Sequence, residues 1–345
     1  MSSSTYSLKS FNTFAIEVMA KKQVIASNIV QLQDAWRHCH HNNTPFLLIG
    51  AGSNILFVDD FAGTVVVNQL KGISITENEQ DWHIHCAAGE NWHQLITTLL
   101  AKGIAGLENM ALIPGMVGSA PIQNIGAYGV ELKDCCEYVD ILDLEKGEQH
   151  RLTTAQCLFG YRDSIFKHHY QYGYAITAVG LKVAKQWQPV LNYGELKTLN
   201  TATVTPNQVF DLVCATRRSK LPDPARYGNA GSFFKNPIVS AEQCAELLKV
   251  YPHMPQYSQA DGSVKLAAGW LIEQCGLKGF TLGGASVHQQ QALVIINTGN
   301  ATSAEIIALA RHIRQSVLNR FDIALEPEVR FIGSQGEVNA TEIIA

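Results

Sequence analysis

The chain has 345 residues, of which 46% are apolar and 16% charged, and its formal net charge is −4. This length gives a prior of about two to three domains, and the apolar content is sufficient for sizeable cores. The scattered lysines and arginines form no basic face that could neutralise a run of phosphates. Nucleic acid is therefore excluded as the main partner, whereas one phosphorylated small molecule can be accommodated.

Neither a membrane span nor a secretory leader is indicated. No stretch approaches 18 consecutive apolar residues, and residues 1–6 lack a basic region followed by an apolar one. The eight cysteines include no CxxC pair, which argues against a zinc site and a disulfide framework and favours buried thiols. We expect a cytoplasmic monomer with no membrane partner and no bound metal.

The first half of the chain alternates helical and strand patterns. Apolar residues at 32, 35, 36 and 39 predict an amphipathic helix that ends before Asn42, so that the histidines at 38, 40 and 41 belong to a solvated helix end rather than a metal site. Residues 45–49 and 55–58 predict two strands around a glycine loop. Residues 82–86 predict another strand, after which Asn91 caps a helix that stops at Gly103. Further short strands are expected at 139–142 and 175–179.

The second half begins after residues 220–224, where two prolines one residue apart resist both helix and central strand. Ser240, with Gln243 three residues on, predicts the start of one helix, and a second is expected from Leu266 to Gly276. Residues 292–296 predict a buried strand. Thr302 and Glu305 form a capping box for a last helix with one apolar face.

Two glycine-rich segments carry the strongest functional signal. Residues 115–129 contain four glycines among small residues, and a second loop, residues 50–54, follows the strand at 45–49. Exposed backbone amides and positive φ angles suit the binding of a large phosphorylated ligand. A dinucleotide-binding fingerprint is excluded because Ile55 stands where its last glycine would be and no helix follows. Taken alone, the loop at 50–54 fits a plain strand–turn–strand equally well.

Three further motifs place polar groups among glycines, aromatic residues or prolines. They are residues 160–164, 228–237 and 325–330. Each also has a structural interpretation: Arg162 could pair with Asp163, Ser232 could cap a turn, and Glu328 could lie on a solvated strand edge. Together they point to one site.

With these motifs, the chain resembles the UDP-N-acetylenolpyruvoylglucosamine reductase family, type I, from end to end. The resemblance implies an α+β fold in which a vanillyl-alcohol-oxidase-type FAD-binding domain precedes a smaller α+β substrate-binding domain. The implied limits are 1–68 and 69–219 for two FAD-binding subdomains, 220–330 for the substrate domain and 331–345 for a C-terminal tail.

The implied reaction is the NADPH-dependent reduction of the enolpyruvyl group of UDP-N-acetylglucosamine enolpyruvate to UDP-N-acetylmuramate, a precursor of peptidoglycan. By the resemblance, Arg162 clamps the substrate carboxylate, Ser232 donates the proton to C2, and Glu328 stabilises the enolate. The residues implied at the UDP-sugar are Tyr193, Lys220, Asn236, Lys278 and Gln291. The two lysines suit the negative charge of the diphosphate. Tyr193 belongs to a loop that is implied to close over the substrate.

The resemblance also implies FAD as the cofactor and NADPH as the reductant, although no motif for NADPH stands out in the sequence. Residues 50–58 and 114–129 contain neither histidine nor cysteine, so we expect FAD to be bound without a covalent link. The implied FAD-binding residues are Gly50, Gly52, Ser53, Asn54, Ile55, Pro114, Gly115, Gly118, Ser119, Ile122, Gln123, Asn124, Gly126, Ala127, Tyr128, Gly129 and Arg330.

Two functions from other classes stay open. One is a flavin oxidase of the same fold that passes electrons to oxygen. The other is a non-redox UDP-sugar-binding protein or transferase whose glycine loops hold only the nucleotide.

Overall fold

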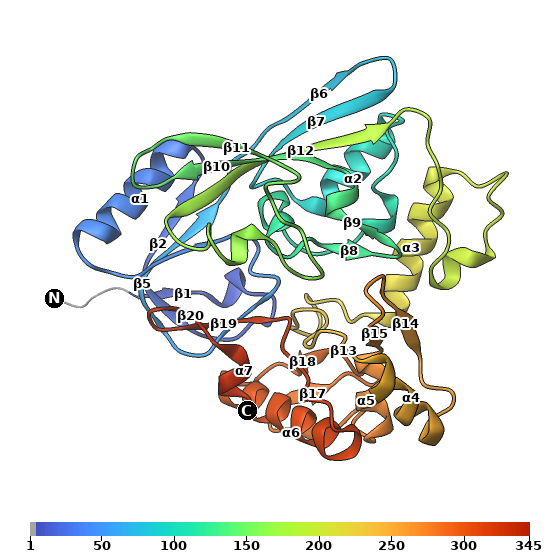
Figure 1. Ribbon diagram of the computed structural model, residues 1–345. Helices are drawn as coiled ribbons and strands as arrows, with labels where there is room; N and C mark the ends of the chain where they lie inside the picture. The colour runs from blue at the N-terminus through green and yellow to red at the C-terminus, as the bar shows by residue number, and fades with distance from the viewer. Residues whose placement is uncertain (1–4) are drawn as a thin grey trace. The chain divides into compact units, whose positions relative to one another are not determined.

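A computed structural model describes residues 5–345, so the expectation for residues 1–4, that they include no leader, lies outside the described part (Figure 1). Residues 5–6, 20–52 and 62–219 form one compact unit, here called unit 1. Residues 7–19, 53–61 and 220–345 form the other, unit 2. Two N-terminal segments thus belong with the C-terminal half, and the contiguous limits at 68, 219 and 330 stay a prediction.

Unit 1 contains a five-stranded antiparallel sheet of order β11-β10-β12-β7-β6. Ile84 pairs with Leu181 at its centre, and both are fully buried. Its strands are β6 (Ile73–Glu77), β7 (Asp81–Ala87), β10 (Cys136–Asp143), β11 (Gln149–Thr153) and β12 (Tyr174–Ala184).

A four-stranded sheet of order β1-β2-β5-β3 contains the parallel pair β3 and β5. Its strands are β1 (Tyr6–Ser7), β2 (Met19–Ala26), β3 (Phe46–Ile49) and β5 (Phe61–Asn68). Helix α1 (Ile29–His41) packs Leu32 and Trp36 into a cluster with Val66. The helix predicted there is confirmed, and its three terminal histidines are exposed.

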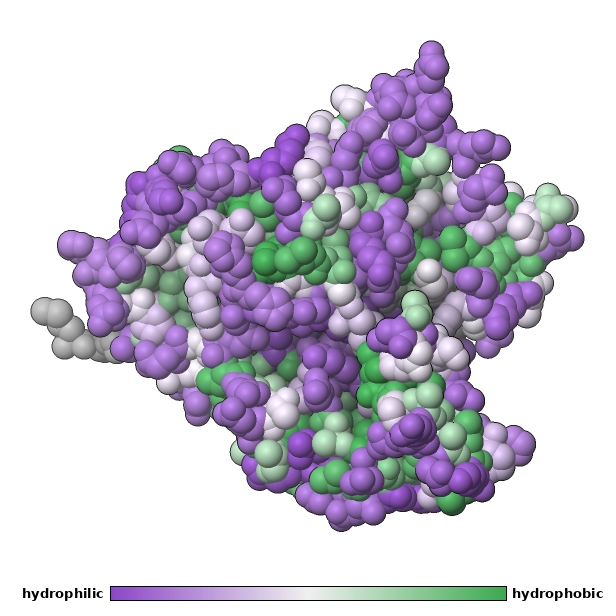
Figure 2. Space-filling view, in the orientation of Figure 1, coloured by the Kyte–Doolittle hydropathy of each residue, from purple (hydrophilic) through white to green (hydrophobic). Residues whose placement is uncertain are grey.

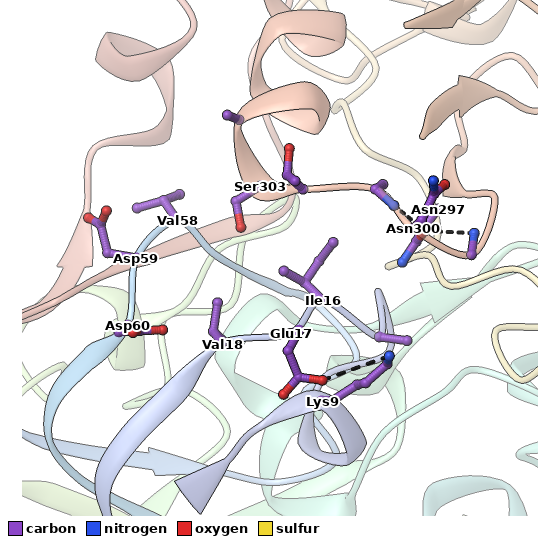
Figure 3. Close-up of a pocket in the computed structure, with 15 residues that line it drawn as sticks. Lys9, Ile16, Glu17, Val18, Val58, Asp59, Asp60, Asn297, Asn300 and Ser303 are labelled. Atoms are coloured by element: carbon purple, nitrogen blue, oxygen red, sulfur yellow. Dashed lines mark hydrogen bonds and ion pairs between the residues drawn. The ribbon is translucent and has the colours of Figure 1, made fainter. Parts of the chain in front are cut away.

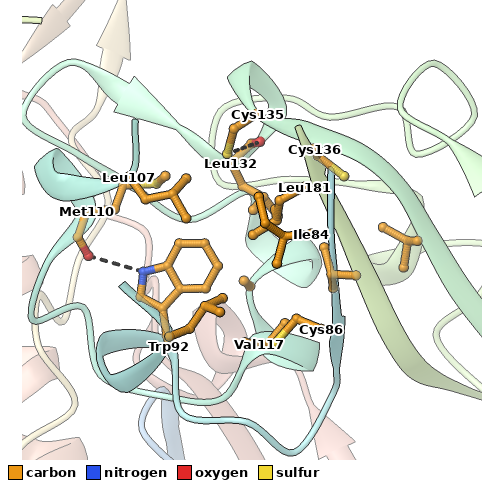
Figure 4. Close-up of a cluster of buried hydrophobic side chains, with 14 of the residues drawn as sticks. Ile84, Cys86, Trp92, Leu107, Met110, Val117, Leu132, Cys135, Cys136 and Leu181 are labelled. Carbon is orange, nitrogen blue, oxygen red and sulfur yellow. Dashed lines mark hydrogen bonds between the residues drawn. The ribbon is translucent and has the colours of Figure 1, made fainter. Parts of the chain in front are cut away.

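Helix α2 (Trp92–Ala101) begins where Asn91 accepts a hydrogen bond from the amide of Gln94, as predicted. Its Trp92 is 1% exposed and donates from Nε1 to the carbonyl of Met110 at 3.1 Å (Figure 4). This indole lies among Leu107, Val117 and other apolar side chains, so it anchors the start of the second glycine segment and the chain just before it. Unit 1 also includes β8 (Gly126–Ala127), β9 (Val130–Glu131) and all but the last residue of α3 (Pro206–Lys220).

Unit 2 contains three small sheets, of which one pairs β4 in parallel with β19 and β19 with β20. Its strands are β4 (Ile55–Phe57), β13 (Ile238–Val239), β14 (Gln256–Ser258), β15 (Val264–Leu266), β16 (Thr281–Leu282), β17 (Ala285–Val287), β18 (Ile295–Asn297), β19 (Arg330–Gly333) and β20 (Gly336–Val338). Its helices are α4 (Ala241–Val250), α5 (Ala268–Gln274), α6 (Ser303–Phe321) and α7 (Ala340–Ile343).

Most predicted elements of unit 2 are confirmed, including the Ser240 cap and the capping box of Thr302 with Glu305. Two boundaries were wrong. Leu266 lies in β15 because Ala267 is extended and α5 begins only at Ala268. Residues 292 and 293 lie in a turn closed by the amide of Val294 on the carbonyl of Gln291, and Val294 forms only an isolated bridge with Ser232, so β18 begins at Ile295.

Seven of the eight cysteines are buried and all are free thiols, which confirms them as small apolar residues, with Cys275 partly exposed. Within residues 5–345 there is no helix with the length and apolarity needed to cross a membrane. Hydrophilic residues cover most of the face seen in Figure 2, and hydrophobic ones lie between them in small groups.

The ring of His93 on α2 stacks on Phe210 of α3 with centroids 5.6 Å apart, and its Nδ1 accepts from the amide of Leu112. Burial, with smaller effects of Arg218 and Arg217, lowers the pKa of His93 below 6.5. As the pH falls below about 6.5, the unfolded chain therefore binds a proton that the folded chain refuses, and the free energy of unfolding decreases.

We expect the free energy of unfolding of His93→Asn to decrease less steeply between about pH 6.5 and 5, because the variant lacks the imidazole whose pKa is lowered in the folded chain. Urea denaturation at a series of pH values measures it. His38→Asn, at an exposed site on α1, is the matched control and should keep the wild-type slope. A wild-type slope in His93→Asn would contradict the assignment.

Candidate functional site

The two glycine segments lie against each other in unit 1. A Cβ placed on Gly50, directly after β3, would lie 3.1 Å from Cγ of Met116 and 3.9 Å from Oγ of Ser119. Gly52 has φ of 62°, a left-handed conformation that favours glycine. The loop joins β3 to β4 as predicted, without a following helix.

The second segment is less bare than its glycines suggest. It forms 3₁₀ turns at Val117–Ser119 and Pro121–Gln123, in which the amides of Ser119 and Ala120 donate to protein carbonyls. The amide of Gly118 donates to the carbonyl of Ala88 at 2.8 Å. Several amides are thus used by the fold itself, so a ligand has fewer donors here than the sequence indicated.

Hydrogen bonds join the second glycine segment to the segment that carries Arg162. Nδ2 of Asn124 donates to the carbonyl of Gly160 at 3.0 Å, and Oγ of Ser164 donates to the carbonyl of Ile122 at 2.7 Å. Arg162, at φ of 53°, directs Nη2 to the carbonyl of Gly126 at 3.5 Å. The guanidinium therefore lies beside the predicted FAD-binding segment, within one unit.

Tyr128 and Tyr193 meet edge to face, with ring centroids 6.0 Å apart. Buried Asn109 holds their two loops together, because its Nδ2 donates to the carbonyls of Tyr128 and Val190, each at 2.9 Å. Burial raises the pKa of Tyr128, which keeps its hydroxyl protonated at neutral pH. Tyr193 is 47% exposed, so one face of the tyrosine pair stays open to solvent.

In unit 2, main-chain contacts bring Ser232 and Glu328 onto neighbouring segments. The amide of Glu328 donates to the carbonyl of Phe233 at 2.8 Å, and Ser232 pairs across from Val294. Nδ2 of Asn54 donates to the carbonyl of Glu328 at 3.2 Å. Both Ser232 and Glu328 are half-buried.

An aromatic cluster fixes this arrangement. The fully buried ring of Phe233 lies 5.1 Å from Phe234, 6.0 Å from Phe331 and 6.4 Å from Phe14, centroid to centroid. Phe233 and Phe234 are thus core residues, and their effect on Ser232 is to hold its backbone in place.

The residues expected at the UDP-sugar gather only partly in unit 2. Oδ1 of Asn236 accepts from the amide of Ala268 at the start of α5, and Gln291 Oε1 lies next to Gly269 one residue later. Lys278 forms an ion pair with Glu273 at 2.6 Å beyond the end of α5. Lys220 ends α3 and is exposed, whereas Tyr193 belongs to unit 1.

The expected site residues thus fall into two groups, one in each unit. Unit 1 holds Gly50, Gly52, Pro114, Gly115, Gly118, Ser119, Ile122, Gln123, Asn124, Gly126, Ala127, Tyr128, Gly129, Arg162 and Tyr193. Unit 2 holds Ser53, Asn54, Ile55, Lys220, Ser232, Asn236, Lys278, Gln291, Glu328 and Arg330.

A separate cavity of about 430 Å³ lies in unit 2, between the N-terminus of α6 and the segments around Ile16 and Asp59 (Figure 3). Lys9 and Glu17 form an ion pair at its edge, and Ser303 donates to the carbonyl of Phe57. None of the expected site residues lines this cavity.

Two residues of unit 1, Asn109 and Arg217, did not stand out in the sequence. Asn109 lies outside the motifs that stand out in the sequence, and its partners are 19 and 81 residues away. Arg217 lies in an ordinary helical pattern on α3, close enough to Arg162 for the two charges to interact. Its position three residues before Lys220, a residue expected at the UDP-sugar, is the one signal in the sequence that points to Arg217.

Two family models match this chain, one in its first half and one in its second half. A family model described as "FAD binding domain" matches residues 20–153. One described as "UDP-N-acetylenolpyruvoylglucosamine reductase, C-terminal domain" matches residues 223–332. The predicted fold class, an FAD-binding domain followed by a smaller substrate-binding domain, is thereby confirmed.

The resemblance also extends from end to end. The UDP-N-acetylenolpyruvoylglucosamine reductase of Pectobacterium atrosepticum is 59% identical over 345 residues, which covers 100% of both chains. That of Escherichia coli K12 is 57% identical over 340 residues, 99% of each chain. The crystal structure of the Thermus caldophilus reductase matches in fold, with a TM-score of 0.66 at 23% identity over 95% of this chain and 98% of that one. At this identity over its whole length, the chain belongs to the UDP-N-acetylenolpyruvoylglucosamine reductase family.

Proposed function

We propose that this protein reduces the enolpyruvyl group of UDP-N-acetylglucosamine enolpyruvate to UDP-N-acetylmuramate, with FAD as cofactor and NADPH as reductant. The observation that carries the proposal is 59% identity along the entire chain to a reductase of that name, together with the FAD-binding match at residues 20–153. The product is a precursor of peptidoglycan.

The residues of unit 1 fit a flavin dinucleotide. The two segments of small residues lie so close together that a Cβ on Gly50 would be only 3.1 Å from Cγ of Met116. Gly52, Gly115 and Gly129 have positive φ angles, which favour glycine, so no side chain covers these turns. Such turns present neutral amide donors to a diphosphate. Gly52 and Gly115 are the residues whose backbone we assign to it.

The FAD is held without a covalent link in this proposal. The glycine segments contain no histidine or cysteine. Burial raises the pKa of Cys86 to about 12 and that of Cys136 to about 12, so these thiols stay protonated and are poor nucleophiles at neutral pH. Acid precipitation should therefore release all of the flavin into solution.

When bound, FAD that NADPH has reduced supplies a hydride to C3 of the enolpyruvyl group. The negative charge that develops at C2 and on the substrate carboxylate needs a fixed cation. Arg162 suits this task because a guanidinium remains charged and meets a carboxylate at two points. The Arg162 guanidinium is held in place by its contact with the Gly126 carbonyl and by the hydrogen bond from Asn124 to the Gly160 carbonyl, two residues before Arg162.

Ser232 is the proton donor to C2 and Glu328 the second group that stabilises the enolate in this proposal. The hydrogen bond from the Glu328 amide to the Phe233 carbonyl keeps the two residues on adjacent segments, which supports their joint action. A hydroxyl is a weak acid in water, but a positioned donor in a site closed to water becomes competent against a basic enolate.

Lys220, Asn236, Lys278 and Gln291 are proposed to hold the UDP-sugar, with the lysines at the diphosphate. The first turn of α5, which Asn236 and Gln291 both border, supports their grouping. Tyr193, exposed on its loop, is proposed to close over the substrate. A monomeric state and a cytoplasmic location stay predictions from the sequence.

The function is tested anaerobically on the purified protein. NADPH should bleach the flavin absorbance, and the enolpyruvyl sugar nucleotide should restore it with formation of UDP-N-acetylmuramate. Restoration by oxygen alone would indicate an oxidase, and a colourless protein that binds UDP-sugars would indicate a non-redox function. Either result contradicts the proposal.

Gly118→Ala should weaken FAD binding because it displaces the second glycine segment. The added Cβ would lie 2.5 Å from Cβ of Ala88, so the segment must move, at a cost of about 1–3 kcal/mol in the free energy of unfolding. Gly160→Ala is the matched control, because its Cβ would meet only Asp163 at 3.6 Å. Flavin retention on gel filtration and chemical denaturation measure both variants. Equal flavin retention and equal stability of the two variants would show that the close approach of Gly118 to Ala88 is unimportant.

Ser232→Ala separates the two half-reactions. Flavin reduction by NADPH should stay near the wild-type rate, because no substrate carbanion exists at that stage. Reoxidation by the enolpyruvyl substrate should slow by about 10²-fold or more, as expected when a general acid is lost. Anaerobic rapid mixing records both steps. Equal, modest slowing of the two would assign Ser232 to the turn instead.

A further inference from the structure

Residues 185–193 link β12 to the turn that begins at Gly194, and they form no helix or strand of their own. Their conformation therefore depends on contacts with other parts of unit 1. One contact comes from Glu108, whose side chain is buried and accepts a hydrogen bond from the indole Nε1 of Trp187. The segment is thereby anchored six residues before Tyr193.

Asn109, the next residue after Glu108, provides a second anchor. Its side chain is 3% exposed, and its Nδ2 donates to the carbonyl of Val190 and to the carbonyl of Tyr128, each at 2.9 Å. One amide group thus joins the segment that carries Tyr193 to the second glycine segment. Moving either carbonyl away would break a buried hydrogen bond, and a buried polar group without its partner is costly. The Asn109 side chain therefore fixes the separation of the two segments at this point.

The backbone of Tyr128 needs this support. Its φ is 50°, in the left-handed region that a residue with a Cβ adopts only at a cost and keeps only where its surroundings hold it. A Cβ on the following Gly129 would lie 3.1 Å from Oδ1 of Asn192 and 3.9 Å from Cβ of Tyr193. The peptide between Tyr128 and Gly129 thus lies close to the segment of Tyr193, and the hydrogen bond from Asn109 to its carbonyl fixes its orientation.

The tyrosine pair lies beyond the two anchors. The rings of Tyr128 and Tyr193 meet edge to face with centroids 6.0 Å apart, and residues 192–195 are exposed. The anchored residues form the base of the loop and the exposed ones its tip. A loop that closes over a ligand would therefore turn about Val190, with the ring of Tyr128 fixed beside it.

Resting on the proposed function, we propose that Asn109 is a positioning residue for substrate binding. By holding the carbonyls of Tyr128 and Val190 in one geometry, it sets the place from which Tyr193 closes over the UDP-sugar. Asn109 acts through this loop and does not contact the substrate itself. Because the fold already orders the base of the loop, less of the binding free energy is spent on ordering it when the substrate binds.

The test is a double-mutant cycle of Asn109→Ala and Tyr193→Ala. All proteins are loaded with oxidised FAD, and calorimetric titration with the enolpyruvyl substrate gives their dissociation constants. Each single variant is expected to bind about tenfold more weakly than wild type, because the substrate must then order the loop or loses its contact with the ring. If Asn109 acts through Tyr193, the double variant binds no more than about threefold more weakly than Tyr193→Ala. An additive loss of about 100-fold would overturn the proposal.

Asn68→Ala is the matched control. Asn68 is also buried in unit 1, where its Nδ2 donates to the carbonyl of Ile176 at 3.1 Å and its Oδ1 accepts from the amide of Leu70 at 3.2 Å. Both asparagine variants should melt below the wild-type temperature, because each loses buried hydrogen bonds. Only Asn109→Ala should lose affinity for the substrate. An equal loss of affinity in Asn68→Ala, or wild-type affinity in Asn109→Ala, would overturn the proposal.

Hydrogen exchange of the protein without substrate supplies an independent readout. Amides of residues 187–193 should exchange faster in Asn109→Ala than in wild type or in Asn68→Ala, because the base of the loop has lost an anchor. Unchanged exchange in this segment would show that Asn109 does not hold it, and would overturn the proposal.

If Asn109→Ala does not fold, Asn109→Ser replaces it in the cycle, since a hydroxyl still donates one hydrogen bond. The criterion stays the same, namely whether its effect adds to that of Tyr193→Ala. Wild-type affinity in Tyr193→Ala would remove the group through which Asn109 acts and overturn the proposal. Failure of the wild type itself to reduce the enolpyruvyl substrate would instead refute the proposed function.

Discussion

The constraint on which the FAD-binding unit depends is close approach of backbone to backbone around the second glycine segment. At Gly118 the chain lies so near Ala88 that a single methyl group does not fit, and the Gly118 amide donates to the Ala88 carbonyl. That contact fixes the segment against the end of β7. From there, Asn124 and Ser164 carry the arrangement to the segment of Arg162. One missing Cβ thus positions residues more than forty positions away.

In unit 2 the proposed site residues are held in position by aromatic packing, not by a close approach of backbone segments. Phe233 is fully buried against Phe14, Phe234 and Phe331, which come from three separate parts of the chain. Its carbonyl then accepts from the amide of Glu328. The polar groups proposed for catalysis are therefore the half-buried neighbours of a rigid core, which limits the reorganisation needed in the transition state.

The sequence predicted what is local and missed what is distant. Helices α2, α4 and α6 begin at the side-chain caps expected of them, because a cap depends on residues three apart. Leu266 was placed in a helix because apolar spacing does not reveal the extended Ala267. Segments 7–19 and 53–61 join unit 2 through pairings with residues far along the chain, such as β4 with β19, which no local pattern reveals. Asn109 and Arg217 were missed for the same reason.

The arginines show how partners decide what a charge can do. Arg330, expected to bind FAD, donates from Nε and Nη2 to both oxygens of Glu337 across the β19–β20 hairpin. Its charge is neutralised within the fold, so any contact with a cofactor must use its backbone or its remaining Nη1. A guanidinium paired by its own chain stabilises the hairpin, and no local pattern in the sequence shows that Glu337, seven residues away, is the partner of Arg330.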